Sequence, residues 1–207
     1  MKRIAESTVR RLSIYLRFLE EFEGRGRATV SSDELARRGG TTSAQVRKDL
    51  SVFGSFGKRG LGYSVPELAT SLREILGLGR EWKVVIIGAG KIGAALAQYH
   101  GFRERGFVIV AAYDTNPEKI GGTLEGIAIR DMQSFESDVT RENPDIAVLT
   151  IPMHSAQEVL DRVARAGIKA VLNFAPAQLH APMDMAVKTV NMAMELEGLT
   201  FALTNAH

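Results

Sequence analysis

Apolar residues near the start of the chain recur every three or four positions. Leu12 and Leu19 belong to this pattern, which predicts an amphipathic helix over residues 7–23. Glycines directly after that stretch end the helix. Ser31 and Thr42 each begin a capping box, the arrangement that opens a helix by pairing side chains with exposed N–H groups. The helices that these boxes open are expected over residues 32–38 and 43–53.

Beyond residue 82, apolar runs of strand length alternate with helical patterns. The expected strands cover residues 83–87, 108–113, 145–151, 168–173 and 187–191. The expected helices cover residues 91–104, 131–142 and 154–166. Such alternation with short connections is typical of a doubly wound parallel sheet, so we expect a Rossmann-type α/β domain here.

A further helix over residues 67–78 follows Pro66, and a glycine-rich linker over 77–81 precedes the first long strand. We therefore expect an α/β protein in three parts. Their ranges are 1–78, 82–190 and, for a C-terminal helix, 191–207.

The predicted helix over 43–53 has two different faces. Val46, Leu50 and Phe53 would pack inward. A short turn separates this helix from the preceding one, as in a helix-turn-helix whose second helix reads the major groove. Basic side chains there can contact guanine or phosphate, and glutamine can pair with adenine. The residues expected to face DNA are Ser43, Ala44, Gln45, Arg47, Lys48 and Ser51.

A glycine-rich basic hairpin is expected next. Residues 54–65 read GSFGKRGLGYSV, in which the glycines imply tight turns between short strands. Lys58, Arg59 and Gly60 would form the tip. A basic hairpin in this place is the wing of a winged helix, and arginine suits a narrow minor groove. The alternative is a surface hairpin whose charges only confer solubility.

Charge is distributed unevenly along the chain. Residues 1–80 hold 15 Lys and Arg against 9 Asp and Glu, whereas residues 81–207 hold 11 against 15. The net charge of the first part is therefore +6 and that of the second is −4, although the whole chain carries only +2. This asymmetry favours a polyanion such as double-stranded DNA as the partner of the first part.

Several function classes are disfavoured. The chain has no cysteine, so disulfides and thiolate metal sites are excluded, and its four histidines lack metal-ligand spacing. No N-terminal apolar segment predicts a signal peptide, and no apolar run is long enough to span a bilayer. We therefore expect a cytoplasmic protein without a metal and without catalytic residues.

A nucleotide-binding turn lies between the strand over 83–87 and the helix that follows. Its six residues match G-x-G-x-x-G: Gly88, Ala89, Gly90, Lys91, Ile92 and Gly93. The glycines permit the turn, the approach of a pyrophosphate and close helix packing. Asp114 ends the next strand, where a carboxylate binds ribose hydroxyls and repels a 2′-phosphate. NAD(H) is therefore expected rather than NADP(H), with Lys119 as the one nearby feature against it.

Two later strand ends point to the same crevice, because ligands of open α/β sheets bind outside the carboxyl ends of strands. The apolar side chains there suit a nicotinamide ring, although ordinary packing at strand ends is an alternative for each. The residues concerned are Thr150, Ile151, Pro152, Asn173, Phe174, Ala175 and Pro176.

Two other functions stay open at this point. One is a small NAD-dependent oxidoreductase with a helical cap, for which His154 is a conceivable acid or base. Fewer than 35 residues follow Pro176, however, too few for a substrate domain. The other is a winged-helix regulator that senses a different adenine nucleotide, such as a CoA derivative.

Taken together, these motifs resemble the Rex family of redox-sensing transcriptional repressors, over nearly the whole chain. The motifs that carry the resemblance are QVRKDL at 45–50, FGSFGKRGLGY at 53–63, GAGKIG at 88–93, AGIK at 166–169 and NFAP at 173–176.

The resemblance implies a homodimeric repressor that binds palindromic operators and is released when NADH rises relative to NAD⁺. It also implies that a C-terminal helix, here about 192–204, swaps between subunits. Arg11 and Arg17 match basic residues near the DNA or the interdomain contacts, and Tyr99 matches a tyrosine that senses the nicotinamide.

One position departs from the family pattern. The family usually has Val-Asp where this chain has Val190-Asn191. That Asp belongs to a switch network with the tyrosine and an N-terminal arginine. Asn191 still forms hydrogen bonds but carries no charge, so it does not supply the charge that this network has in the family.

Overall fold

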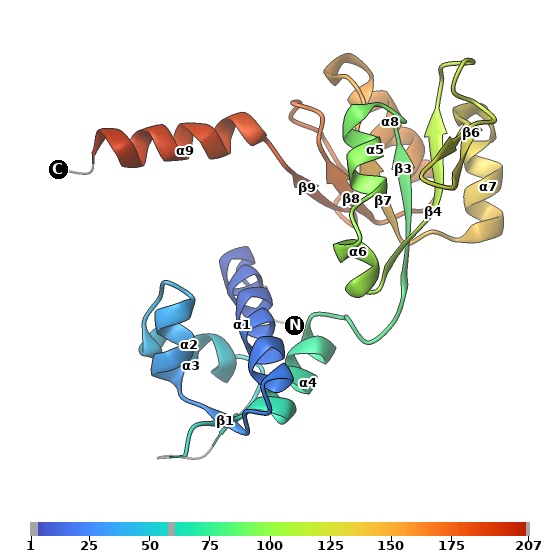
Figure 1. The fold of residues 1–207 in the computed structure, drawn as a ribbon. Coiled ribbons are helices and arrows are strands. Elements are labelled where there is room, and N and C mark those ends of the chain that lie inside the picture. Colours follow the sequence, from blue (N-terminus) through green and yellow to red (C-terminus); the bar gives the residue numbers. More distant parts are fainter. Residues whose placement is uncertain (1–3, 58–60, 206–207) are drawn as a thin grey trace. The chain divides into compact units, whose positions relative to one another are not determined.

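The computed structural model describes residues 4–57 and 61–205. The chain forms two compact units, Met1–Arg80 and Glu81–His207, and each is described by itself (Figure 1). Among the described residues, no helix combines the length and the apolar character that crossing a bilayer requires.

The first unit is built from helices around one apolar core. Its core includes Leu12, Leu16 and Leu19 from the first helix and Leu68 and Leu72 from the last, which packs against it. The helices are α1 (Glu6–Gly24), α2 (Ser32–Arg38), α3 (Ser43–Ser51) and α4 (Val65–Ile75).

The N-caps lie where the sequence predicts them, but the side chains of Glu34 and Gln45 bond Arg27 and Asp49 and do not reach back to complete the capping boxes. Ser31 Oγ accepts a hydrogen bond from the Glu34 N–H at 3.2 Å, and Thr42 Oγ1 accepts one from the Gln45 N–H at 3.1 Å. These bonds satisfy N–H groups that have no partner within the helix, so they define where α2 and α3 begin.

The segment predicted as a hairpin, residues 54–65, ends in a strand that pairs with an earlier part of the chain. The strand β2 (Tyr63–Ser64) pairs antiparallel with β1 (Thr29–Val30), which precedes α2. Gly62 allows this approach, because a Cβ there would lie 2.5 Å from the Val30 carbonyl oxygen. A two-residue strand leaves no alternation in the sequence, which explains why β1 was not predicted. The predicted tip, Lys58–Gly60, lies outside the described residues.

The second unit contains a seven-stranded sheet in the order β5-β6-β4-β3-β7-β8-β9. All pairs are parallel except β5 with β6. The strands are β3 (Trp82–Ile87), β4 (Phe107–Asp114), β5 (Thr123–Leu124), β6 (Ile127–Asp131), β7 (Ile146–Leu149), β8 (Ala170–Asn173) and β9 (Ala186–Thr189). The strands β5 and β6 were not predicted from the sequence.

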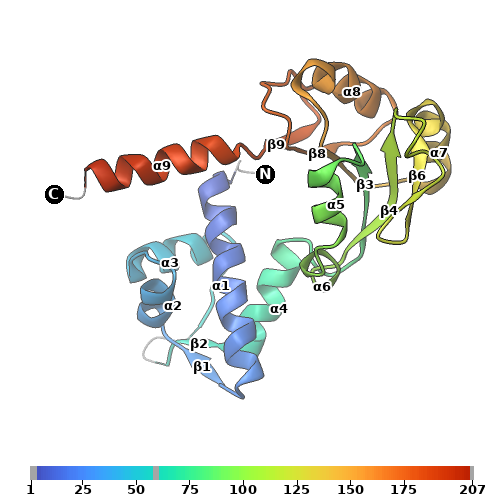
Figure 2. The same ribbon diagram turned by 45° about the horizontal axis from the view of Figure 1, so that its top comes forward.

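Alternate residues of β3 point into two separate apolar clusters. Val85 and Ile87 pack with α7 and α8, whereas Val84 and Ile86 pack with α5. Helices therefore cover both faces of the sheet (Figure 2). These elements are α5 (Lys91–Ala97), α6 (Gly101–Glu104), the short 3₁₀ helix η1 (Met132–Ser134), α7 (Phe135–Glu142) and α8 (Met153–Arg165).

The prediction of a single helix over 91–104 is wrong, because the helix is interrupted between α5 and α6. The ring of Tyr99 turns back over Gly101 at this break. A Cβ on Gly101 would lie 2.6 Å from that ring, so the glycine makes room for it. A contact between neighbouring residues of this kind has no periodic signature.

The last helix, α9 (Met192–Thr204), follows β9 and has no buried residue. Its apolar side chains are exposed, including Leu196, Leu199 and Phe201, of which Phe201 is 71% exposed. An exposed apolar helix of this length needs a partner surface to be stable in water.

Candidate nucleotide site and DNA-binding surface

The glycine turn packs tightly at two of its three glycines. Gly88 has φ +106°, and a Cβ there would lie 2.6 Å from the Thr150 carbonyl oxygen. A Cβ on Gly93 would lie 2.2 Å from the Gly88 carbonyl oxygen. At Gly90 a Cβ would meet nothing within 4 Å. Gly88 and Gly93 are therefore required by the fold, and Gly90 faces the open space that a pyrophosphate needs.

The end of β7 holds this turn in place. Thr150 Oγ1 donates a hydrogen bond to the Gly88 carbonyl oxygen at 2.6 Å, and the Gly88 N–H donates to the Tyr113 carbonyl oxygen at 2.7 Å. Thr150 was predicted from the sequence to contact the nucleotide. In the structure its hydroxyl is bonded to the turn, and the residue also lines the cavity beside the turn.

Asp114 lies beside the turn and is bonded on both carboxylate oxygens. Its Oδ2 accepts hydrogen bonds from the Ala89 N–H at 2.9 Å and from Lys119 Nζ at 3.0 Å, and its Oδ1 accepts from the Asn116 N–H at 2.9 Å. Burial raises the pKa of this carboxyl, but these hydrogen bonds outweigh it, so the pKa of Asp114 lies below its usual range. The carboxylate is therefore charged at neutral pH and is aimed at the turn.

A cavity of about 540 Å³ opens between these elements. Its size suits a cofactor pocket. The predicted contacts that line it are Gly88, Gly90, Ile92, Asp114, Thr150, Ile151 and Pro152, and Lys119 joins them.

The other predicted contacts, as far as the described residues show, lie outside that lining. Asn173 is fully buried, and its amide bonds with the Ala175 backbone at 2.9 and 3.0 Å, so it forms the turn after β8. Phe174 is half-buried in the cluster with α5, and Pro176 is exposed. Lys91, the first residue of α5, is exposed.

Tyr99 lies at a different hollow from the one at the glycine turn. It is 56% exposed and lines a space of about 610 Å³ with residues of α6, β4 and β6. Its ring contacts Phe102 edge-to-face, with centroids 5.1 Å apart. Tyr99 is therefore accessible to a partner or ligand that reaches this hollow.

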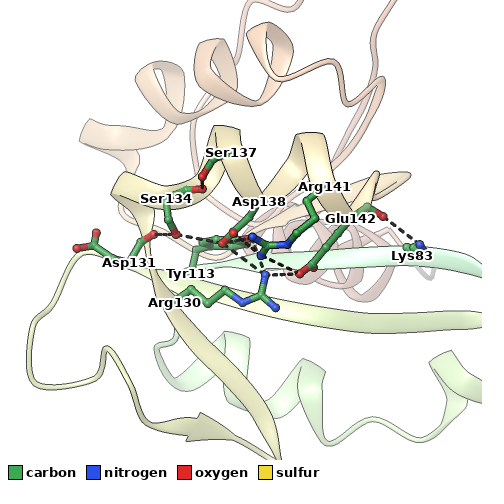
Figure 3. A network of polar contacts seen from close by, with 9 residues as sticks. All are labelled: Lys83, Tyr113, Arg130, Asp131, Ser134, Ser137, Asp138, Arg141 and Glu142. Atoms are coloured by element: carbon green, nitrogen blue, oxygen red, sulfur yellow. Dashed lines mark hydrogen bonds and ion pairs between the residues drawn. The ribbon is translucent and has the colours of Figure 1, made fainter.

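A polar network lies next to Asp114 along β4 and was missed in the sequence (Figure 3). The Tyr113 hydroxyl donates to Asp138 at 3.3 Å, and Arg130 pairs with Glu142 at 2.7 Å and Asp138 at 3.4 Å. Burial raises the pKa of Tyr113 to about 12. The network joins α7 to β4 and β6, so it fixes the end of the strand that carries Asp114.

The surface of α3 matches its predicted faces. Val46 and Leu50 are buried, whereas Arg47 and Lys48 are exposed. The remaining predicted contacts are Ala44 and Ser51, which are exposed, and Ser43 and Gln45, which are half-buried. The Arg47 guanidinium donates a hydrogen bond to Ser32 Oγ at 2.9 Å, so it lies between α3 and the start of α2.

Arg11, predicted from the resemblance to lie near DNA or the interdomain contacts, is engaged within the first unit. Its Nε and Nη2 lie 2.6 and 2.7 Å from the two carboxylate oxygens of Asp49. Asp49 is only 2% exposed, and the sequence predicted no role for it. It lies three positions after Val46, so helical spacing places it next to the inward face of α3, but the spacing does not reveal its partner.

The two other predicted switch residues lie in different units. Arg17 is exposed on α1. Asn191 caps α9, since its Oδ1 accepts hydrogen bonds from the N–H groups of Ala193 at 3.0 Å and Met194 at 3.4 Å. No group of acidic and histidine side chains within the described residues could hold a metal ion.

Comparisons with known proteins match both units. A family model described as "CoA binding domain" matches residues 79–177, and one described as "Putative DNA-binding protein N-terminus" matches residues 3–51. The redox-sensing transcriptional repressor Rex of Syntrophomonas wolfei is 46% identical over 97% of this chain and 96% of its own. The Rex repressor of Thermus thermophilus is 43% identical over 98% and 95%. The chain belongs to the Rex family of redox-sensing transcriptional repressors.

Solved structures of the Rex family have the same fold. The Rex-family repressor RSP in complex with NAD⁺ and operator DNA superposes with a TM-score of 0.94 at 37% identity, covering 100% of this chain and 95% of that one. RSP in complex with NADH superposes with a TM-score of 0.90 at 35% identity, covering 100% and 97%. The α/β architecture expected from the sequence is thereby confirmed.

Proposed function

We propose that this protein is a transcriptional repressor that binds operator DNA as a homodimer and is released when NADH binds. One observation carries the proposal: a glycine turn with an open Gly90 and an aligned Asp114 lies in the same chain as a basic helix-turn-helix. The relatives named Rex, and the RSP complexes with NAD⁺, NADH and operator DNA, support it. We infer that the chain is not an enzyme and acts in the cytoplasm.

The nucleotide is NAD(H), and the residues present fit it. Gly90 and the first N–H groups of α5 would hold the pyrophosphate, since a helix N-terminus favours an anion. Asp114 would accept hydrogen bonds from the ribose hydroxyls. Ile151 and Pro152 supply apolar surface at the end of β7, on the side of the cavity away from Asp114's strand.

An apolar surface at the nicotinamide end gives a physical basis for redox sensing. NAD⁺ carries a positive charge on the ring that NADH lacks. Desolvating a charge without a partner is costly, so Ile151 and Pro152 favour the neutral ring. A difference of 1.4 kcal/mol would give about tenfold discrimination.

The DNA-binding surface is the exposed face of α3 together with the basic segment that follows it. Arg47 and Lys48 would contact bases and phosphates, and Ser43, Ala44, Gln45 and Ser51 would lie in the major groove beside them. Lys58, Arg59 and Gly60 are proposed as the minor-groove contact. Arg11 would act through Asp49, to which it is bonded.

The dimer is proposed to form through α9. Six apolar side chains of this helix are between 61% and 78% exposed, and burying them against a second chain would remove them from water. These side chains are Met192, Met194, Leu196, Leu199, Phe201 and Leu203. Replacing Leu199 and Phe201 together by lysine should give a monomer in sedimentation velocity, whereas the wild type should sediment as a dimer.

Release of DNA follows from linkage. If NADH prefers the form of the dimer that binds DNA poorly, operator DNA must weaken NADH binding by the same factor. Movement of the nucleotide-binding units that changes the separation of two α3 helices would supply the physical route. Two half-sites must be one helical turn or a multiple apart, so a small change in that separation lowers affinity.

The test is a gel shift on a palindromic operator with NAD⁺ and NADH added separately, followed by NADH titration with and without that operator. NADH should release the DNA, and the operator should lower NADH affinity. Equal NADH affinities in the two titrations would rule the mechanism out. Mass spectrometry of the co-purified nucleotide distinguishes NAD(H) from a CoA derivative, and turnover of a hydroxy acid or aldehyde would indicate an oxidoreductase instead.

A further inference from the structure

The carboxylate of Asp49 is the centre of a buried polar cluster in the first unit. Arg11 Nε and Nη2 lie 2.6 and 2.7 Å from its two oxygens, and the Tyr15 hydroxyl donates to Oδ2 at 3.1 Å. Thr8 Oγ1 donates to Oδ1 at 3.4 Å, and Gln45 Nε2 donates to Oδ1 at 2.8 Å. Three of these partners come from α1, whereas Gln45 lies on α3 at the predicted DNA surface.

The charge of Asp49 determines which way the Gln45 amide faces. Burial raises the pKa of Asp49, but hydrogen bonds from Arg11, Gln45 and Tyr15 lower it more, so it is ionised at neutral pH. An ionised carboxylate only accepts hydrogen bonds. Gln45 must therefore turn its NH₂ group toward Asp49, and the reversed amide would place two oxygens against each other.

This orientation leaves a defined pair of groups on Gln45. No donor within the described residues hydrogen-bonds Oε1 of Gln45, and one of its two N–H groups donates to Asp49. The second N–H and Oε1 together form one donor and one acceptor, which matches N7 and N6 of adenine in the major groove. Gln45 is half-buried, near the N-terminus of α3, where recognition helices contact bases.

We propose that Asp49 is a positioning residue for base recognition: it holds Gln45 with Oε1 facing the DNA, so that Gln45 reads an adenine in each half-site. The inference rests on the proposed function. Arg11 then serves as the counter-ion that keeps Asp49 charged, and it does not need to contact DNA itself.

The experiment measures base discrimination by the full-length protein. A palindromic duplex is first selected from a random-sequence pool with the wild type, and each base pair of its half-site is then replaced in turn. Gln45→Ala should lose about 5- to 150-fold of discrimination at one A·T pair, the range that a bidentate contact gives. Asp49→Asn should lose discrimination at that same pair, because a neutral amide no longer fixes the direction of Gln45.

Tyr15→Phe is the matched control. It removes one hydrogen bond to the same carboxylate but leaves the charge and the contact with Gln45. It should lower the melting temperature while base discrimination stays at the wild-type value. If Asp49→Asn keeps full discrimination, or if Tyr15→Phe loses it equally, the proposal is overturned.

A second measurement does not depend on how the Asp49 variant folds. In the wild type, one side-chain amide proton of Gln45 should exchange with water more slowly than those of the exposed Gln133, as measured by NMR. Equal exchange would overturn the positioning role even where DNA binding is intact. Failure of the wild type to select any duplex would instead overturn the proposed function, and base recognition with it.

Discussion

The ammonium group of Lys119 lies 3.0 Å from Oδ2 of Asp114, and both side chains line the nucleotide cavity. The preference expected for NAD(H) over NADP(H) depends on the negative charge of Asp114 at the ribose. The contact shows that this charge is partly balanced. Lys119 is 38% exposed, so solvent screens the pair, and its effect on nucleotide choice should be moderate.

Replacing Lys119 by Met should sharpen the preference for NADH over NADPH. The uncompensated carboxylate would repel a 2′-phosphate more strongly, and a change near 1 kcal/mol corresponds to about fivefold in the ratio of dissociation constants. Calorimetric titration with both nucleotides measures that ratio. Lys169→Met is the control, because Lys169 pairs with Asp184 outside the lining of this cavity. If the Kd for NADPH divided by the Kd for NADH is lower in Lys119→Met than in the wild type, the prediction is contradicted.

Gly90 and Gly93 should respond differently to substitution by alanine. Gly93→Ala should cost about 1–3 kcal/mol of stability, because the added Cβ would lie 2.2 Å from the Gly88 carbonyl oxygen. Gly90→Ala should keep its stability, since the Cβ meets nothing within 4 Å, but it should weaken NADH binding at least tenfold. Thermal melting and NADH titration of both variants measure the two effects. NADH binding by Gly90→Ala at the wild-type affinity would show that the pyrophosphate lies elsewhere.

Tyr113 should make the second unit sensitive to alkaline pH. Burial raises the pKa of Tyr113 to about 12, whereas an unfolded tyrosine titrates near 10. Its stabilisation is therefore present below pH 10 and is lost as the pH rises from about 10 through about 12. Tyr113→Phe should cost about 1 kcal/mol at pH 7 and should flatten this alkaline loss.

The single tryptophan provides the measurement and the control for Tyr113. Trp82 lies in β3, so urea unfolding followed by its fluorescence reports on the second unit. Tyr15 also has a pKa raised by burial to about 12, but it lies in the first unit. Tyr15→Phe should leave the curve observed by Trp82 unchanged. An equal alkaline loss in wild type and Tyr113→Phe would assign that loss to another group.

Local patterns predicted the parts of the fold that depend on residues close in sequence. The caps at Ser31 and Thr42, the inward face of α3 and the turn at 88–93 follow from spacing alone. The pairing of β1 with β2 depends on contacts between residues more than thirty positions apart, and no periodicity records it.

In the candidate sites too, local patterns predicted single residues but not their partners from elsewhere in the chain. Asp114 is where the motif places it, but its pairing with Lys119 depends on the loop after β4. Asp49 is the clearer case, because it was assigned no role in the sequence although it lies three positions after the buried Val46. Its burial is compensated by Arg11 from another helix, which a pattern within α3 cannot reveal.

Arg47 and Lys48 should affect DNA binding in different ways. Arg47→Ala should weaken operator binding and relax the preference at one base pair, whereas Lys48→Ala should weaken binding to all sequences and lower the salt slope by about 1. Fluorescence anisotropy over a range of salt concentrations measures both. Neither variant should change NADH affinity. Arg103→Ala, an exposed arginine of α6 in the other unit, is the control. Specific binding by Arg47→Ala at moderate salt would show that α3 is not the recognition helix.

Asn191→Asp should strengthen the response to NADH without disturbing α9. Asparagine and aspartate are equally good N-caps, and the bonds from Ala193 and Met194 to Oδ1 would remain. The new carboxylate supplies the charge that the resemblance implies at this position, and we expect it to act together with Arg17, the predicted switch arginine. The ratio of operator affinities with saturating NAD⁺ and NADH should therefore rise, by about tenfold for 1.4 kcal/mol.

Two further variants test whether charge causes this rise. Asn191→Ala loses the cap at a cost of about 1 kcal/mol and should not increase the ratio. Adding Arg17→Met to Asn191→Asp should return the ratio to the wild-type value, because the carboxylate then lacks its cation. Anisotropy of a labelled operator with each nucleotide measures all four proteins. If Asn191→Asp leaves the ratio unchanged, the switch in this chain works without a charge at position 191, and the hydrogen bonds of Asn191 are sufficient.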